Sequence, residues 1–185
     1  MLTRLAGIAA LGAGLSLLIG FLGSVIPSVN QFTVPIFYGL AVVGLVGIHQ
    51  QQVRVRPGLA WMGFAAALLG LVAGISGFVL AAAGVLPASG GEYGFVSALA
   101  LWIGSTVLGA TMLAIRVLPV PVGLAITIGA PVAMIGLIAG RGGAASDALD
   151  VVAQLGIVIY AFGWVGVGLS LLAAQPREGV LGPAS

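Results

Sequence analysis

The sequence predicts an all-α protein, a bundle of six transmembrane helices with both termini on the cytoplasmic side. Of its 185 residues, 61% are hydrophobic and only 5% are charged. Soluble domains carry roughly 25% charged residues, so lipid is the expected solvent for most of this surface. The apolar residues form long runs between short polar loops, and no ten-residue segments of alternating polarity, typical of β-barrel strands, are present.

The first apolar run extends from about residue 5 to residue 26, which is long enough to cross a bilayer at 1.5 Å per residue. It exceeds the usual apolar core of a signal peptide, and no small-x-small cleavage site follows it, so we expect a retained span. Residues 27–31 read as the first loop. The second span is predicted over residues 33–49, with Pro35 in its first turn.

The longest polar run of the chain, His49–Gly58, separates the second span from the third, predicted over residues 58–86. The later spans are predicted over residues 94–115, 119–139 and 147–174. All six spans belong to a single predicted transmembrane domain of residues 1–174. Residues 175–185 are expected to form a mobile cytoplasmic tail. Arg116–Pro119 reads as a tight turn, and Pro131 should kink the fifth span. Loops this short make neighbouring spans antiparallel.

The arginines predict the orientation, because Lys and Arg collect on the cytoplasmic side of a membrane. Six spans place five of the six arginines on the side of the two termini: Arg4, Arg54, Arg56, Arg116 and Arg177. The other side carries Arg141 together with Glu92, Asp147 and Asp150. We therefore expect a multi-pass protein of the plasma (inner) membrane with cytoplasmic termini.

Small residues recur every four positions in the first span, at Gly12, Ser16, Gly20 and Ser24. Such spacing places them on one helix face, where a second helix can approach closely. With 31 glycines in the chain, pairs of this kind also arise by chance. The four-residue stripe is a candidate helix-packing face, either within the bundle or toward a partner.

Catalytic, cofactor-binding and metal-binding residues are not predicted, and neither is a cofactor. The chain has no cysteine and no lysine, which excludes thiol chemistry and Schiff bases. His49, the single histidine, cannot complete a metal or haem site from this chain and suits a helix C-terminus. Asp147 and Asp150 suit the first turn of a helix, and Gln154, inside the sixth span, should hydrogen-bond to a neighbouring helix. Nucleic acid is not an expected partner, since the net charge is only +2.

Three features resemble a broad group of small six-span bacterial membrane proteins of uncharacterised function. They are Leu5–Ala10 in the first span, the polar run before Arg54 and Gly58, and Arg116–Pro119 before the fifth span. The resemblance implies the same six-span fold and no activity.

Three functional hypotheses remain open from the sequence. The first is a non-enzymatic structural or accessory subunit that packs against other membrane proteins, lipids or hydrophobic pigments. The second is a small permease or channel for an uncharged or hydrophobic solute. The third is a membrane enzyme that uses the acids Glu92, Asp147 and Asp150. No acidic or basic side chain falls in the middle of a span, and such residues usually mark ion pathways, so an ion-coupled transporter is disfavoured.

Overall fold

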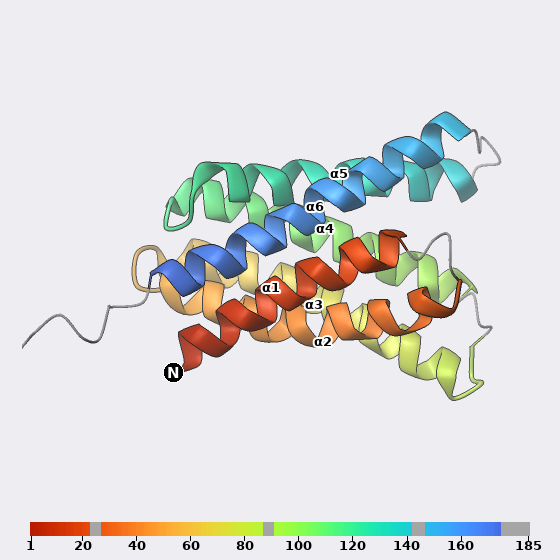
Figure 1. Cartoon of the computed structure of the whole chain (residues 1–185), viewed down its shortest axis with the longest axis horizontal. Coiled ribbons are helices and arrows are strands. Elements are labelled where there is room, and N and C mark those ends of the chain that lie inside the picture. Colours follow the sequence, from red (N-terminus) through yellow and green to blue (C-terminus); the bar gives the residue numbers. More distant parts are fainter. Residues whose placement is uncertain (23–26, 87–90, 142–146, 175–185) are drawn as a thin grey trace, which may run out of the picture.

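The computed structural model of the chain describes residues 1–22, 27–86, 91–141 and 147–174. This part folds into six α-helices that run lengthwise past one another (Figure 1). They are α1 (Leu2–Leu22), α2 (Pro27–Gln52), α3 (Pro57–Ala82), α4 (Gly91–Ile115), α5 (Val120–Arg141) and α6 (Asp147–Ala173). In the described residues, five helices are long and apolar enough to cross a membrane, and α5 contributes a shorter apolar stretch, Val120–Gly136. The predicted six-helix membrane bundle is confirmed.

Two helix boundaries differ from the predicted spans for identifiable reasons. α2 starts at Pro27, so the segment predicted as the first loop is helical and Pro35 lies inside the helix. Pro27 suits a first turn, where a missing N–H costs nothing. α3 stops at Ala82, four residues earlier than predicted, because Gly84 adopts a left-handed φ of 71°. The Val85 N–H then donates to the Leu80 carbonyl at 2.9 Å, which closes the helix end.

The helices form a closed ring in which each helix packs against its neighbours in the sequence and α6 returns to α1. Figure 1 shows α1 and α6 lying side by side along the near face of the bundle. Among the neighbouring pairs, α2 and α3 make the least extensive contact. The space inside the ring, here called the lumen, holds a core of buried side chains and one cavity.

Glycines allow the closest approaches between helices. A Cβ added to Gly14 of α1 would lie 2.7 Å from the carbonyl oxygen of Ala161 in α6. A Cβ added to Gly129 of α5 would lie 2.5 Å from the backbone nitrogen of Tyr160. Backbone therefore touches backbone on both sides of α6, the arrangement that small residues permit between membrane helices.

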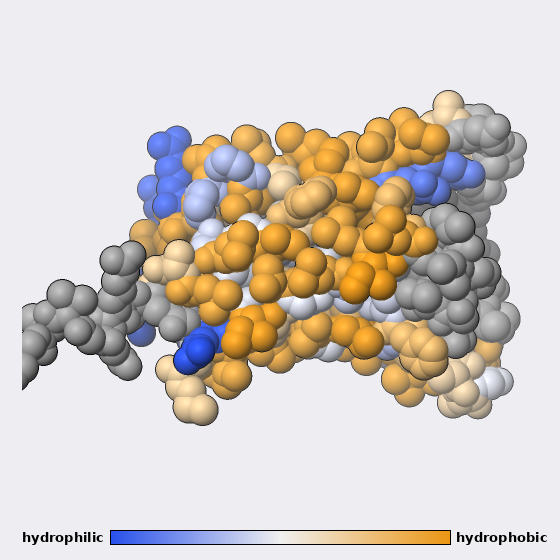
Figure 2. Space-filling model, in the orientation of Figure 1, coloured by the Kyte–Doolittle hydropathy of each residue, from blue (hydrophilic) through white to orange (hydrophobic). Residues whose placement is uncertain are grey.

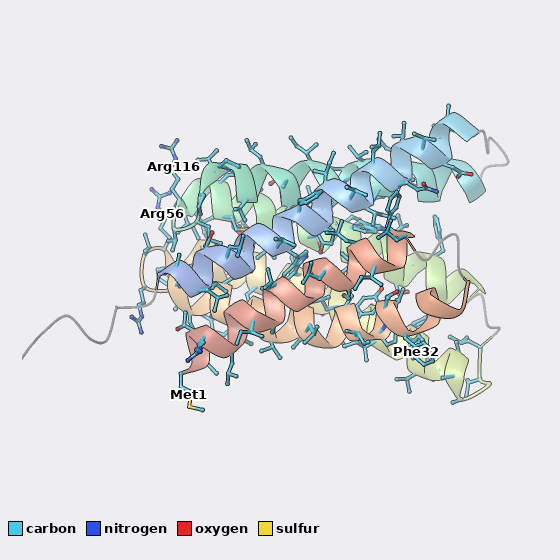
Figure 3. The ribbon with its side chains drawn as sticks, viewed as in Figure 1. Met1, Phe32, Arg56 and Arg116 are labelled. Atoms are coloured by element: carbon cyan, nitrogen blue, oxygen red, sulfur yellow. The ribbon has the colours of Figure 1, made fainter. Side chains whose placement is uncertain are left out.

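The surface is apolar along the length of the bundle, with hydrophilic residues gathered toward its two ends (Figure 2). Met1, Arg56 and Arg116 lie at one end, and Phe32 lies at the other (Figure 3). Arg4, in the first turn of α1, and Arg54, in the α2–α3 turn, belong to the first of these ends, here called the arginine end. Arg177 lies outside the described residues. α1 begins and α6 finishes at the arginine end, as an even number of spans requires (Figure 1).

Candidate functional site: a cavity in the lumen

A cavity of about 370 Å³ lies inside the ring, in the half of the bundle remote from the arginine end. Four helices line it: the last turns of α1 and the first halves of α2, α4 and α6. The lining residues are Leu17, Gly20, Phe21, Thr33, Val34, Phe37, Tyr38, Leu101, Trp102, Gln154 and Ile157. Most of these side chains are aliphatic or aromatic, so the cavity is predominantly apolar.

A cluster of aromatic rings, here called the aromatic floor, lies beside the cavity and meets it through the lining residues Phe37 and Trp102. The Phe37 ring lies edge-on to Tyr160 and to Trp164, each at a centroid distance of 6.2 Å. Trp102 lies edge-on to Tyr160 at 5.2 Å. Tyr160 and Trp164 are each only 1% exposed, and the Tyr160 hydroxyl shares a 2.8 Å hydrogen bond with Ser105 Oγ. α6 is thereby joined to α2 and α4 across the lumen.

Three polar side chains in the cavity wall have no hydrogen-bond partner in the described part of the chain: the Tyr38 hydroxyl, the Trp102 indole N–H and the Gln154 amide. The sequence predicted a bond from Gln154 to a neighbouring helix. Gln154 is exposed and borders the cavity, and no such bond forms among the described residues. Hydrogen-bonding capacity is thus available beside an apolar space.

Side chains fill the lumen on the other side of the floor, toward the arginine end. One stripe of α2 supplies Phe37, Ala41, Leu45, Ile48 and Gln52, each 2% exposed or less. Their spacing of three or four residues keeps them on the inner face of the helix. Leu108, Met112, Ile126 and Leu171 are buried in the same core cluster as the aliphatic members of this stripe. The filled core separates the cavity from the arginine end.

Gln52 is unusual within this filled half. The side chain is 1% exposed, and neither its amide nitrogen nor its amide oxygen has a hydrogen-bond partner among the described residues. A buried amide without partners costs about 1–3 kcal/mol in mutational data.

His49 lies in the last turn of α2, as the sequence predicted. Its ring packs against two aromatic rings of α3, with centroids 4.4 Å from Trp61 and 4.5 Å from Phe64. In the described residues, no group of three or more His, Cys, Asp or Glu side chains is placed to hold a metal ion. His49 therefore anchors α2 against α3 at the arginine end, far from the cavity.

The predicted small-residue stripe of α1 faces more than one neighbour. A Cβ added to Gly12 would lie 2.9 Å from Leu40 of α2, and Ser16 is buried with its hydroxyl bonded to the Ala13 carbonyl. Gly20 lines the cavity, and Ser24 lies outside the described residues. The stripe thus borders α2 and the lumen, where only small side chains leave room for the cavity.

The acids predicted at the opposite end are only partly described. Asp150 is exposed in the first turn of α6. The side chains of Glu92, Arg141 and Asp147 lie outside the described part of the structure. Asp150 and His49 lie at opposite ends of the bundle.

The sequence did not reveal the aromatic floor. Its members come from three helices and share no motif; the one local signal is the four-residue spacing of Tyr160 and Trp164 on one face of α6. Comparison of the chain with protein-family models, with curated proteins and with solved structures finds no match in any of the three.

Proposed function

We propose that the protein is a non-enzymatic accessory protein of the plasma membrane that holds a lipid or hydrophobic pigment in its lumen cavity. The observation that carries the proposal is the apolar cavity of about 370 Å³ inside a membrane bundle. That volume falls within the range of small-molecule sites, which are mostly apolar with a few polar groups. A lipid-soluble molecule would fill the space from the bilayer without leaving an apolar environment.

Two arrangements support a binding role over an enzymatic one. The described residues that line the cavity include no carboxylate, histidine, lysine or cysteine to act as a base or nucleophile. The one histidine packs between aromatic rings at the arginine end, beyond the filled half of the lumen. Membrane lipids and other membrane-protein subunits remain the proposed partners of the outer apolar surface.

The direct test is to identify what co-purifies with the protein. Membranes are solubilised into nanodiscs, and lipid-soluble compounds are measured by mass spectrometry against the bulk membrane extract. Val34→Phe/Ile157→Phe places two rings in the cavity wall. The matched control, Val43→Phe/Ile159→Phe, makes the same changes on the same two helices at positions 41% and 38% exposed. We expect a compound enriched with the wild type and the control but not with the filled variant. Equal amounts with all three proteins would contradict the proposal.

A permease for an uncharged solute is the second candidate, and the position of the cavity gives it some support. A cavity confined to one half of the membrane would correspond to one state of an alternating-access cycle, and Gln52 is a buried polar residue of the filled half. Such a cycle must expose Gln52 to water in its other state. With Gln52→Cys in a chain free of cysteine, fast labelling by a water-soluble thiol reagent would favour a permease, whereas complete protection would favour the binding role.

The proposed orientation puts the arginine end in the cytoplasm. Single cysteines at Gln51, near the arginine end, and at Val85, which is 68% exposed just after α3, test this orientation in intact cells. We expect an impermeant thiol reagent added outside to label Val85→Cys alone. Labelling of Gln51→Cys alone would reverse the orientation, and labelling of both from outside would refute the six-span arrangement.

A further inference from the structure

We infer that the lumen cavity selects an uncharged ring compound with carbonyl oxygens and an apolar tail, of the quinone class. The inference rests on the proposed function and names the ligand of the same site. Three properties of the cavity wall, as the described residues form it, support this ligand class: no charged side chain, aromatic faces, and hydrogen-bond donors without a partner in the described part of the chain.

The wall has no ionised group to balance a charge. None of the eleven lining residues is Asp, Glu, Arg, Lys or His. An unpaired ion within the hydrocarbon region is costly, so a phospholipid headgroup or a fatty-acid carboxylate would bind poorly at this depth. The ligand portion inside the lumen is therefore uncharged.

Aromatic side chains from three helices surround the space: Phe21 of α1, Phe37 and Tyr38 of α2, and Trp102 of α4. Aromatic pairs with edge-to-face or offset geometry gain about 0.5–1.5 kcal/mol beyond the burial of area. A flat conjugated ring can use this gain, whereas a saturated acyl chain cannot. The walls thus favour a ring over a chain.

The polar groups of the wall that have no partner among the described residues are rich in donors. The Trp102 indole N–H only donates, and the Tyr38 hydroxyl and the Gln154 amide can both donate. Tyr38 and Trp102 lie eleven residues after the first residue of their helices, about 16 Å along the helix axis. Gln154 lies seven residues after the first residue of α6, about 10 Å along the axis. At such depths bulk water does not satisfy donors, so ligand acceptors would. Carbonyl oxygens on a ring provide acceptors without charge.

Tryptophan fluorescence provides a readout, because quinones quench indoles on contact. Trp102 lines the cavity and Trp164 packs against the lining residue Phe37, whereas Trp61 is 56% exposed near the arginine end. The Trp61→Phe protein, in nanodiscs, is titrated with decylbenzoquinone. We expect saturable quenching. The matched control, Trp102→Phe/Trp164→Phe, keeps only Trp61 and should show only the linear quenching caused by quinone dissolved in the bilayer.

Two substitutions in the Trp61→Phe background test the polar contacts. Gln154→Leu and Tyr38→Phe each remove one hydrogen-bonding group, and each should weaken binding about tenfold, the effect of one well-placed hydrogen bond to an uncharged group. Ser170→Ala removes a hydroxyl of α6 that bonds to the Gly166 carbonyl away from the cavity, and Tyr93→Phe removes a hydroxyl that bonds to Ser76. These two controls should bind as tightly as the parent.

Competition with decylbenzene, which has the same tail and a ring without oxygens, tests whether binding requires the carbonyl oxygens. It thereby distinguishes a quinone site from the proposed site for any hydrophobic molecule, without a further variant. Decylbenzene does not quench, so it restores fluorescence when it displaces the quinone. We expect half of the fluorescence to return only at a decylbenzene concentration at least tenfold above that of the quinone. If equal concentrations restore half of it, the carbonyl inference is wrong, while the proposed hydrophobic site stands. If quenching never saturates and the filled variant Val34→Phe/Ile157→Phe retains the co-purifying compound, both are wrong.

Discussion

Replacing Gln52 by methionine should stabilise the protein. Methionine keeps the unbranched shape and similar volume of glutamine and removes an amide that is 1% exposed with neither polar atom paired in the described structure. An unpaired buried amide costs about 1–3 kcal/mol, and a shape-conserving apolar replacement should return that amount. We therefore expect Gln52→Met to raise the free energy of unfolding by about 1–3 kcal/mol.

The free energy of unfolding is measured by denaturant titration of the protein in mixed micelles. Gln51→Met is the matched control, because it makes the same chemical change one residue earlier on α2, at a side chain that is only partly buried. The control should change stability by no more than about 0.5 kcal/mol. If Gln52→Met lowered stability by more than 1 kcal/mol while the control stayed neutral, Gln52 would have a partner and the reasoning would be refuted.

Three further predictions concern packing and backbone. Ser105→Ala should destabilise the bundle by about 0.6–2 kcal/mol, because it leaves the Tyr160 hydroxyl without its hydrogen-bond partner. Combining it with Tyr160→Phe should cost less than the sum of the two single substitutions. Additive effects in this double-mutant cycle would contradict a direct bond. Gly129→Ala should lower the midpoint temperature of thermal unfolding sharply, because the added Cβ meets the backbone of α6. Gly39→Ala, with open space around the added Cβ, should leave this midpoint unchanged or higher. Equal midpoints for the two variants would argue against backbone contact at Gly129. Arg116 has a left-handed φ of 57°, a conformation that glycine adopts without strain. Arg116→Gly should therefore raise the free energy of unfolding by up to about 1 kcal/mol, and Arg116→Ala should not. A more stable Arg116→Ala variant than Arg116→Gly variant would refute a left-handed turn there.

The fold class was predictable because lipid demands long apolar segments whose backbone bonds are satisfied internally. Hydropathy alone located every helix, and the polar run His49–Gly58 correctly marked the α2–α3 turn. The early start of α2 was missed because the polar residues 28–31 read as a loop, although Pro27 offered an alternative first turn. Hydropathy reports solvent preference and does not by itself distinguish a polar loop from a polar first helical turn.

The cavity was less predictable, for a physical reason. It depends on which faces of α1, α2, α4 and α6 turn inward, and these helices are apolar on all sides, so their hydrophobic patterns carry little directional signal. The aromatic floor joins Phe37, Trp102 and Tyr160 from three helices, a proximity that only the helix order in the ring reveals. Gln154 was expected to bond to a neighbouring helix, but it is exposed beside the cavity and has no such partner among the described residues.

The return of α6 to α1 has a consequence for assembly. Five of the six contacts around the ring join helices adjacent in the chain, and these can form locally as each hairpin inserts. The sixth joins the two helices farthest apart in sequence, and loop closure of that length slows folding. Until α6 is inserted, the first five helices form an open arc, and the side of the lumen between α1 and α5 faces lipid. Mutations at Gly14, where α1 meets α6, should therefore delay maturation of the protein in the cell more than changes at a hairpin seam of similar stability.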